Sequence, residues 1–359
     1  MLEDDLLKEV ERGREGLNQG STTGMVKLDE WTGGNLPNNF SLIVGSSGTG
    51  KSSLAQYSYL YRPLREHEND DNYFCYLFSL EMSANMVLGK LLSTYLYEEF
   101  GKRLSVNHIF SRKKGYILPD AEYELVKKGI DWIKKVKSKF IIFDKALNAE
   151  VLYSRILSEL EKRGRFEETE DRKIYIPNNP NLLFSVMIDH ISLAVPSKGR
   201  DLKREIDLIT AYLVTLRNMA KISPVIVQQI NRDASSMDRR KAGLSDVRMS
   251  DAADSADPSK AAEIMLAVFS PHKERLKNYE KFNIEVLQDN FRAIQILKSR
   301  YGASDIIVPC GFWGDINFWR DLPKAEEITD FNNYLEPNFQ KEEVPDTSEF
   351  DENPTIFTL

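Results

Sequence analysis

The sequence has few of the residues that bind zinc or form disulfides. Among its 359 residues there are only two cysteines, Cys75 and Cys310, and four histidines. Two cysteines cannot build a disulfide framework, and no cluster of His, Cys and carboxylate residues predicts a structural zinc site. We therefore expect a fold stabilised by an apolar core, for which a chain of this length has ample material.

Long apolar runs and internal repeats are also missing. The chain opens with MLEDDLLKEV, which is acidic and lacks the continuous apolar run of a signal peptide or a membrane span. We expect a soluble, intracellular protein without a membrane partner. The βαβα alternation of residues 40–302 favours one large α/β core with appended ends over two domains.

An excess of basic residues is missing as well, since the net charge is −7. The excess of acids is local, because residues 324–359 contain ten acids and two lysines and carry −8, whereas the rest of the chain carries +1. This acidic end contains three prolines and is predicted to be a disordered tail. The nearly neutral body is compatible with a local basic site for a polyanion.

One complete motif is present. Residues 45–53 read GSSGTGKSS, which matches G-x-x-x-x-G-K-[ST], and they stand between an apolar run and a helix-compatible stretch. In this strand–loop–helix context the glycines let backbone N–H groups face phosphate oxygens at the start of a helix. Lys51 would reach the β- and γ-phosphates, and the Ser52 hydroxyl would bind Mg²⁺. The predicted ATP-binding residues are Gly45, Ser46, Ser47, Gly48, Thr49, Gly50, Lys51, Ser52 and Ser53.

Two acids follow predicted buried strands. Glu81 comes directly after residues 73–80, and Asp189 comes directly after residues 182–188. His190 occupies the next position, where ATPases of the AAA+ type usually place their water-activating glutamate. Glu81 is therefore the candidate base, because a carboxylate at the end of a strand beside the loop can reach a water in line with the γ-phosphate. RecA-like motors have this arrangement, and His190 is interpreted as a packing or orienting residue.

Further segments occur in a fixed order along the chain. They are GSTTGMVKLDEWTGG (20–34), FSLEMS (78–83), IDH (188–190), QQINR (228–232), LSDVR (244–248) and LKSRYG (297–302). Over residues 20 to about 320 this order resembles the ATPase domain of DnaB-type replicative helicases. The resemblance implies a RecA-like P-loop NTPase core over residues 20–323, an N-terminal linker helix over residues 1–19, and the acidic tail over residues 324–359.

The resemblance also implies an activity. The chain would be an ATP-hydrolysing DNA helicase that forms a hexameric ring, translocates 5′→3′ on single-stranded DNA and unwinds duplex DNA in the cytoplasm of a bacterial or phage-infected cell. Asp189 would hold the Mg²⁺ shell, Glu81 would activate water and Gln229 would sense the γ-phosphate. Lys298 and Arg300 would enter the ATP site of the neighbouring subunit as a piston and an arginine finger.

Each role has a plainer competitor. Glu81 could instead stabilise the first turn of the helix that starts near Ser83. Gln229 could be an ordinary polar residue at a strand end, and Arg300 could be a solvated charge on a turn.

Two basic clusters follow the strands of Asp189 and Gln229, at residues 197–204 and 231–248. In RecA-like rings such loops face the central channel, so the resemblance implies contact with single-stranded DNA; on charge alone, either could be a solvated loop. Neither cluster interleaves aromatic residues, which predicts phosphate contacts with strong salt dependence. The candidate DNA-binding residues are Lys198, Arg200, Lys203, Arg204, Arg232, Arg239, Arg240, Lys241 and Arg248. Met249, Ser250 and Asp251 follow Arg248 where the family commonly has an acid and a glycine, so Arg248 alone is carried over from residues 244–248.

The first residues predict one amphipathic helix, because Leu2, Leu6 and Val10 recur at intervals of four. A lone helix of this length is marginal in water. The resemblance implies that it docks on a neighbouring subunit, and packing on its own core is the alternative. The family's N-terminal collar domain, which meets primase, has no counterpart here, so we expect primase or loader contacts to differ or to come from a separate polypeptide.

Two other functions remain open from the sequence. A RecA/RadA-like recombination ATPase would share the fold and the glutamate base but form filaments on single-stranded DNA. An assembly or loading factor could use ATP binding as a switch without turnover. The QQINR segment together with Lys298 and Arg300 favours the helicase motor over both.

Overall fold

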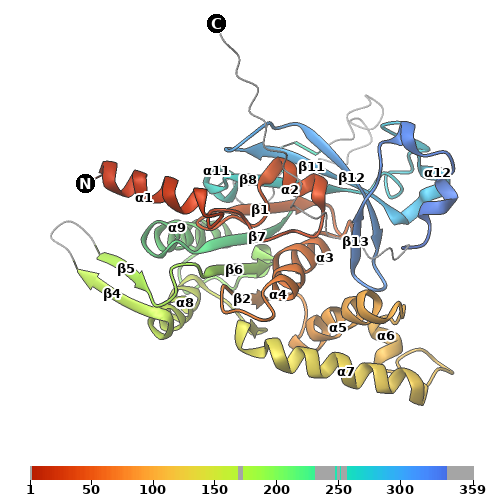
Figure 1. Cartoon of the computed structure of the whole chain (residues 1–359), viewed down its shortest axis with the longest axis horizontal. Coiled ribbons are helices and arrows are strands. Elements are labelled where there is room, and N and C mark those ends of the chain that lie inside the picture. The colour runs from red at the N-terminus through yellow and green to blue at the C-terminus, as the bar shows by residue number, and fades with distance from the viewer. Residues whose placement is uncertain (1, 169–172, 231–246, 249–250, 252–256, 338–359) are drawn as a thin grey trace, which may run out of the picture.

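The computed structural model describes residues 2–168, 173–230, 247–248, 251 and 257–337. Its centre is a nine-stranded sheet in the order β13-β12-β11-β8-β1-β7-β6-β2-β3 (Figure 1). The strands of this sheet are β1 (Ser41–Gly45), β2 (Tyr73–Ser79), β3 (Phe140–Phe143), β6 (Leu183–Asp189), β7 (Ser223–Gln229), β8 (Ile264–Phe269), β11 (Phe291–Ser299), β12 (Ile306–Trp313) and β13 (Phe318–Asp321).

Six adjacent strands, from β8 to β3, run parallel, and β11, β12 and β13 extend the sheet antiparallel. The parallel strands are nearly continuous apolar runs, as expected for strands covered on both faces. Their side chains alternate between two cores: Leu42 and Val44 of β1 belong to one core, and Ile43 belongs to the other. The predicted α/β class is confirmed.

Helices cover both faces of the sheet (Figure 1). One face carries α2 (Val26–Thr32), α3 (Lys51–Gln56), α4 (Arg62–Glu66), α5 (Ala84–Phe100) and α7 (Asp120–Val136), and the other carries α8 (Ala149–Arg163) and α9 (Leu202–Ala220). A π-helical segment, Tyr57–Tyr61, joins α3 to α4, so residues 51–66 form one continuous helix. Shorter elements are α6 (Val106–Ile109), α11 (Asp257–Ala261), α12 (Ile284–Leu287), β9 (Asn278–Tyr279) and β10 (Phe282–Asn283). Across the described ranges, no helix combines the length and apolar character that a membrane span requires.

Two elements lie outside the sheet. The strands β4 (Gly164–Glu168) and β5 (Lys173–Pro177) pair as an antiparallel hairpin, where the sequence predicts a surface loop with a small hairpin. The helix α1 (Leu2–Arg14) confirms the predicted N-terminal helix. Its residues Leu6, Leu7 and Val10 are 67%, 58% and 53% exposed, so α1 does not bury these side chains against the described part of its own core.

The predicted disordered tail differs from the structure at its beginning. Residues 325–327 and 331–334 form short 3₁₀ helices, and Ile328 packs against the apolar core. The Leu335 carbonyl accepts hydrogen bonds from Trp313 Nε1 and Asn290 Nδ2. The packed fold therefore continues to Pro337, because apolar side chains between the acids find the sheet, and residues 338–359 lie outside the described residues.

Candidate active site

The glycine-rich loop joins the carboxyl end of β1 to the amino end of α3, in the predicted strand–loop–helix arrangement. Lys51 is 6% exposed, and its Nζ donates a hydrogen bond to the Ser46 carbonyl, 2.7 Å away. Burial lowers the pKa of Lys51 to about 8, although the charges of Asp189 and Glu81 oppose this shift. A lysine held beside a glycine-rich loop at a helix start can bind phosphate.

Asp189 lies beside the loop because parallel strands bring their carboxyl ends to one edge of the sheet. The Ser52 hydroxyl donates to Asp189 Oδ1 at 2.7 Å, and Gln56 Nε2 donates to Oδ2 at 3.3 Å. Complete burial raises the pKa of Asp189, and the hydrogen bond from Ser52 opposes the shift. A hydroxyl beside a carboxylate, with room for phosphate oxygens, suits Mg²⁺, which is usually held by one or two carboxylates together with substrate phosphates. Within the described ranges, no group of three or more His, Cys, Asp or Glu residues could hold a metal ion by itself.

A cavity of about 240 Å³ opens over the loop. Its walls come from the loop, from the ends of β2, β6 and β7, from α5, and from the end of β12. The lining residues are Ser47, Gly48, Gly50, Lys51, Ser52, Ser53, Glu81, Met82, Lys90, His190, Gln229, Phe312 and Gly314. The fold thus brings together the predicted Lys51, Ser52, Glu81 and Gln229, and it places Asp189 in contact with Ser52.

Glu81 is positioned by the pairing of two strands. Ser79 at the end of β2 lies beside Asp189 at the end of β6, and Glu81 follows two residues later at the cavity wall. The competing role of a helix cap does not fit, because Ser83 is the N-cap residue of α5 and Asp144 Oδ2 accepts the hydrogen bond from the Ala84 N–H. Glu81 is exposed at the cavity, where a water could reach it.

Gln229 ends β7 in register with Gly45 of β1, which places its side chain beside the loop. Its Nε2 lies 3.4 Å from the Nε2 of His190. His190 is 6% exposed and lines the same cavity, so its contact fits the predicted orienting role.

The sequence reasoning missed several residues around the cavity. Lys90 of α5 lines it, and burial lowers the pKa of this lysine while Asp189 and Glu81 oppose the shift. Lys273 donates from its Nζ to the Ser47 carbonyl at 3.5 Å. The available signal for Lys90 was a lone basic residue on a mostly apolar helix nine positions after Glu81. Lys273 lies in a polar insertion and had no local signal.

The family model that matches the chain is that of the DnaB-like helicase C-terminal domain, over residues 20–318. The chain belongs to the DnaB-like helicase C-terminal domain family. The match begins and ends where the sequence resemblance does, to within a few residues, and the recognition made from the motifs is confirmed.

Solved structures of this family share the fold. The ATPase domain of a DnaB-like helicase aligns with a TM-score of 0.68 at 19% identity, covering 89% of this chain and 98% of that one. A DnaB-like replicative helicase, solved with attention to its interactions with primase, aligns with a TM-score of 0.67 at 19% identity, covering 89% of this chain and 66% of that one. The predicted RecA-like ATPase fold is thus confirmed. No curated protein sequence matches the chain.

Lys298 and Arg300 lie at the opposite edge of the sheet from the loop. β11 runs antiparallel to β8, so Ser299 at its end pairs with Ile264, the first residue of β8. Lys298 Nζ donates to the Ser259 carbonyl at 2.9 Å, and Arg300 Nη1 lies 3.5 Å from Glu263 Oε1. The Arg300 side chain remains 54% exposed. Neither residue lines the cavity of its own chain.

The first basic cluster contains two kinds of charge. Arg200 pairs with Glu150 at 2.5 Å and with Glu205 at 3.3 Å, and these hydrogen bonds raise its pKa. Lys198, Lys203 and Arg204 are exposed. Of the second cluster, Arg248 is described and exposed, with its N–H donating to Asp251 Oδ2. The remaining candidates, Arg232, Arg239, Arg240 and Lys241, lie outside the described residues.

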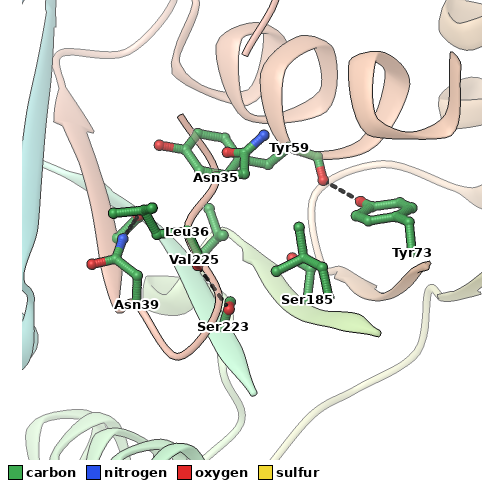
Figure 2. A pocket seen from close by; sticks show the side chains of 10 residues that line it. Asn35, Leu36, Asn39, Tyr59, Tyr73, Ser185, Ser223 and Val225 are labelled. Carbon is green, nitrogen blue, oxygen red and sulfur yellow. Dashed lines mark hydrogen bonds between the residues drawn. The ribbon is translucent and has the colours of Figure 1, made fainter. Parts of the chain in front are cut away.

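A smaller cavity lies at the amino ends of β1, β2, β6 and β7, beside Tyr59 (Figure 2). It is lined by Asn35, Leu36, Asn39, Ser41, Tyr59, Tyr73, Leu183, Ser185, Ser223 and Val225. Figure 2 shows that its polar groups bond mainly to one another, as where the Ser223 hydroxyl donates to the Leu36 carbonyl. With a volume of about 10 Å³, it has room for about one water molecule and not for a nucleotide.

Proposed function

We propose that the chain is the ATP-driven motor of a replicative DNA helicase, which moves along single-stranded DNA as a hexameric ring and separates duplex strands. The observation that carries this proposal is the convergence of Lys51, Ser52, Asp189, Glu81 and Gln229 on one cavity at the carboxyl edge of the sheet. The family, which is a helicase family, supplies the rest of the argument.

Each residue has a task in hydrolysis. Lys51 compensates charge on the β- and γ-phosphates, and Ser52 with Asp189 holds the Mg²⁺ position. When bound there, Mg²⁺ neutralises charge that develops on the phosphate oxygens. Glu81 accepts a proton from a water as its oxygen attacks the γ-phosphorus; the bond from that phosphorus to ADP breaks, giving ADP and inorganic phosphate. Gln229, held against His190, bonds to the γ-phosphate and transmits its presence to β7.

Lys298 and Arg300 serve a neighbouring subunit in this proposal. Their distance from the loop of their own chain and the exposure of Arg300 favour action across an interface. An arginine placed there would neutralise charge on the transferring phosphoryl group, so hydrolysis would require the ring. The exposed apolar residues of α1 favour docking on an adjacent copy, as the linker helix of the family does.

DNA contact is assigned to the two basic clusters. Lys198, Lys203, Arg204 and Arg248 present exposed charges suited to phosphates, whereas Arg200 has its charge compensated by two glutamates. Binding through phosphates would show little sequence preference. The solved relative that was studied with primase makes primase or a loader a candidate partner, and the bacterial or phage-infected cytoplasm is the place where such a motor would act.

The test is an unwinding assay on forked DNA combined with negative-stain imaging, each with ATP and with a nonhydrolysable analogue. Six-membered rings that separate strands only with ATP are the expected result. Filaments on single-stranded DNA without unwinding would instead identify a RecA/RadA-like recombination ATPase. Bound ATP without turnover in any assembly would identify a switch or loading factor.

A further inference from the structure

A buried arginine contacts the glycine-rich loop from outside the cavity. Arg292, the second residue of β11, is 1% exposed, and its Nε donates a hydrogen bond to the Thr49 carbonyl at 2.7 Å. Its Nη1 donates to the carbonyls of Asp289 and Phe291 at 2.6 and 2.8 Å, and its Nη2 donates to Asp289 Oδ1 at 2.9 Å. The guanidinium carbon lies 4.9 Å from the centre of the Phe312 ring.

These contacts separate into an anchor and a reach. The bonds to Asp289 and Phe291 tie the guanidinium to its own turn, which compensates part of the cost of burying a charge. The bond to Thr49 spans 243 positions of the chain and is the contact of this guanidinium with the phosphate-binding loop. Because β11, β8 and β1 are adjacent strands, the sheet places the start of β11 next to the loop that follows β1.

The orientation of one peptide unit follows from this bond. The Thr49 carbonyl and the Gly50 N–H belong to the same trans peptide, so they point in opposite directions. Gly50 lines the cavity and Arg292 does not. An arginine that fixes the carbonyl on the outer side therefore directs the Gly50 N–H toward the inner side, where phosphates would lie.

The aromatic residues beside Arg292 limit movement of this peptide away from the cavity. Gly50 adopts φ 108°, and a Cβ there would lie 3.1 Å from Trp319 and 3.4 Å from Phe312. The rings of Phe312 and Trp319 stack at 4.4 Å. Ring contacts and a charged hydrogen bond together hold the loop from the side of β11, β12 and β13.

We propose that Arg292 is a positioning residue for nucleotide binding, which holds the Thr49–Gly50 peptide so that the Gly50 N–H donates to a phosphate oxygen of a nucleoside diphosphate or triphosphate. The role rests on the proposed function in that the cavity must bind a nucleotide. It requires no DNA, no ring and no hydrolysis, so equilibrium binding of ADP with Mg²⁺ measures it directly.

The test compares two substitutions by calorimetric titration with ADP and Mg²⁺, at a temperature well below unfolding of each protein. Arg292→Gln removes the charge and the fork of donors and should weaken ADP binding about tenfold or more. Arg292→Lys should lose less, because an ammonium can still donate one bond to the Thr49 carbonyl. Partial rescue by lysine is a result that a general packing defect would not give.

Arg163→Lys is the matched control. Arg163 also stacks on an aromatic ring, with its guanidinium carbon 3.6 Å from the centre of Phe74, and it pairs with Glu159, but it lies on α8 and does not line the cavity. It should leave ADP affinity within about twofold of the wild type, a difference below about 0.4 kcal/mol.

Three outcomes would overturn the assignment. They are wild-type affinity in Arg292→Gln, an equal loss in the Arg163→Lys control, and failure of both Arg292 variants to fold, which would make the arginine a residue of the core alone. Wild-type protein that binds no ADP would instead refute the proposed function, and the positioning role with it.

Discussion

The two edges of the parallel sheet differ in what they contain. At the carboxyl edge, Lys51, Ser52, Glu81 and Gln229 line one cavity, and Asp189 lies in contact with it. At the amino edge, Lys298 and Arg300 contact backbone carbonyls and Glu263 and line no nucleotide-sized cavity in the described part of the chain. The first edge has the groups for binding and attack, whereas the second has cations without an anion of matching size. A catalytic cation at the amino edge would therefore act on another molecule.

One strand connects the two edges. β11 begins with Arg292 in contact with the loop and ends next to Arg300. Eight residues of strand separate these two arginines by roughly 26 Å, which exceeds the reach of any side chain. The comparison can be tested by substitutions that treat the edges separately.

The largest effect is expected at the carboxyl edge. Lys51→Ala should abolish ATP binding and unwinding, because β- and γ-phosphate charge would lose its compensating ammonium. Fluorescent-nucleotide binding and a forked-DNA assay measure both. Lys134→Ala, which removes an exposed lysine of α7, is the control and should behave as the wild type. ATP binding of wild-type strength in Lys51→Ala would remove this lysine from the site.

The amino edge should act only between subunits. Arg300→Ala should reduce ATP turnover by roughly 10³–10⁵ while ATP affinity stays near that of the wild type. Mixing Arg300→Ala with Lys51→Ala subunits should restore part of the activity, since one interface can then pair an intact loop with an intact arginine. The double variant in one chain should stay inactive. Mixed oligomers, verified by sizing, that remain inactive would return Arg300 to the role of a surface charge.

The base at the carboxyl edge should separate binding from turnover. Glu81→Gln keeps the shape of the side chain but cannot accept a proton, so turnover should fall about 10²–10⁴-fold with ATP affinity retained. Steady-state hydrolysis and equilibrium binding distinguish the two quantities. Glu99→Gln, an exposed acid on the same helix, should change neither. Near-normal turnover in Glu81→Gln would assign proton transfer to another group.

The smallest effect is expected in the loop after β6. Replacing Lys203 and Arg204 by alanine should weaken single-stranded DNA binding and lower the slope of log affinity against log salt by about 0.7 for every phosphate that is no longer neutralised. Arg200→Ala should leave that slope unchanged, because Glu150 and Glu205 already compensate its charge. Equal slopes in all variants would place DNA contact elsewhere.

Much of the site could be predicted because it follows local rules. A phosphate loop needs contiguous residues, and acids that end apolar strands of a parallel sheet reach one edge of it, so the positions of Lys51, Ser52, Glu81, Asp189 and Gln229 could be inferred. Spacing could not reveal that Arg200 is paired within its own chain, since its partner Glu150 lies on a different helix. It also could not show that the acidic end packs as far as Pro337.

The sequence by itself determined the α/β class, the family, the loop and the side chains that chemistry would require. Only the tertiary structure decided which charges meet. The order β11-β8-β1 places Arg292 against Thr49 and carries Arg300 to the far edge, although the two arginines are close in sequence. The physical reason is that strand order and direction depend on burial across the whole sheet, whereas motifs and periodicity record only what neighbouring residues of the chain share.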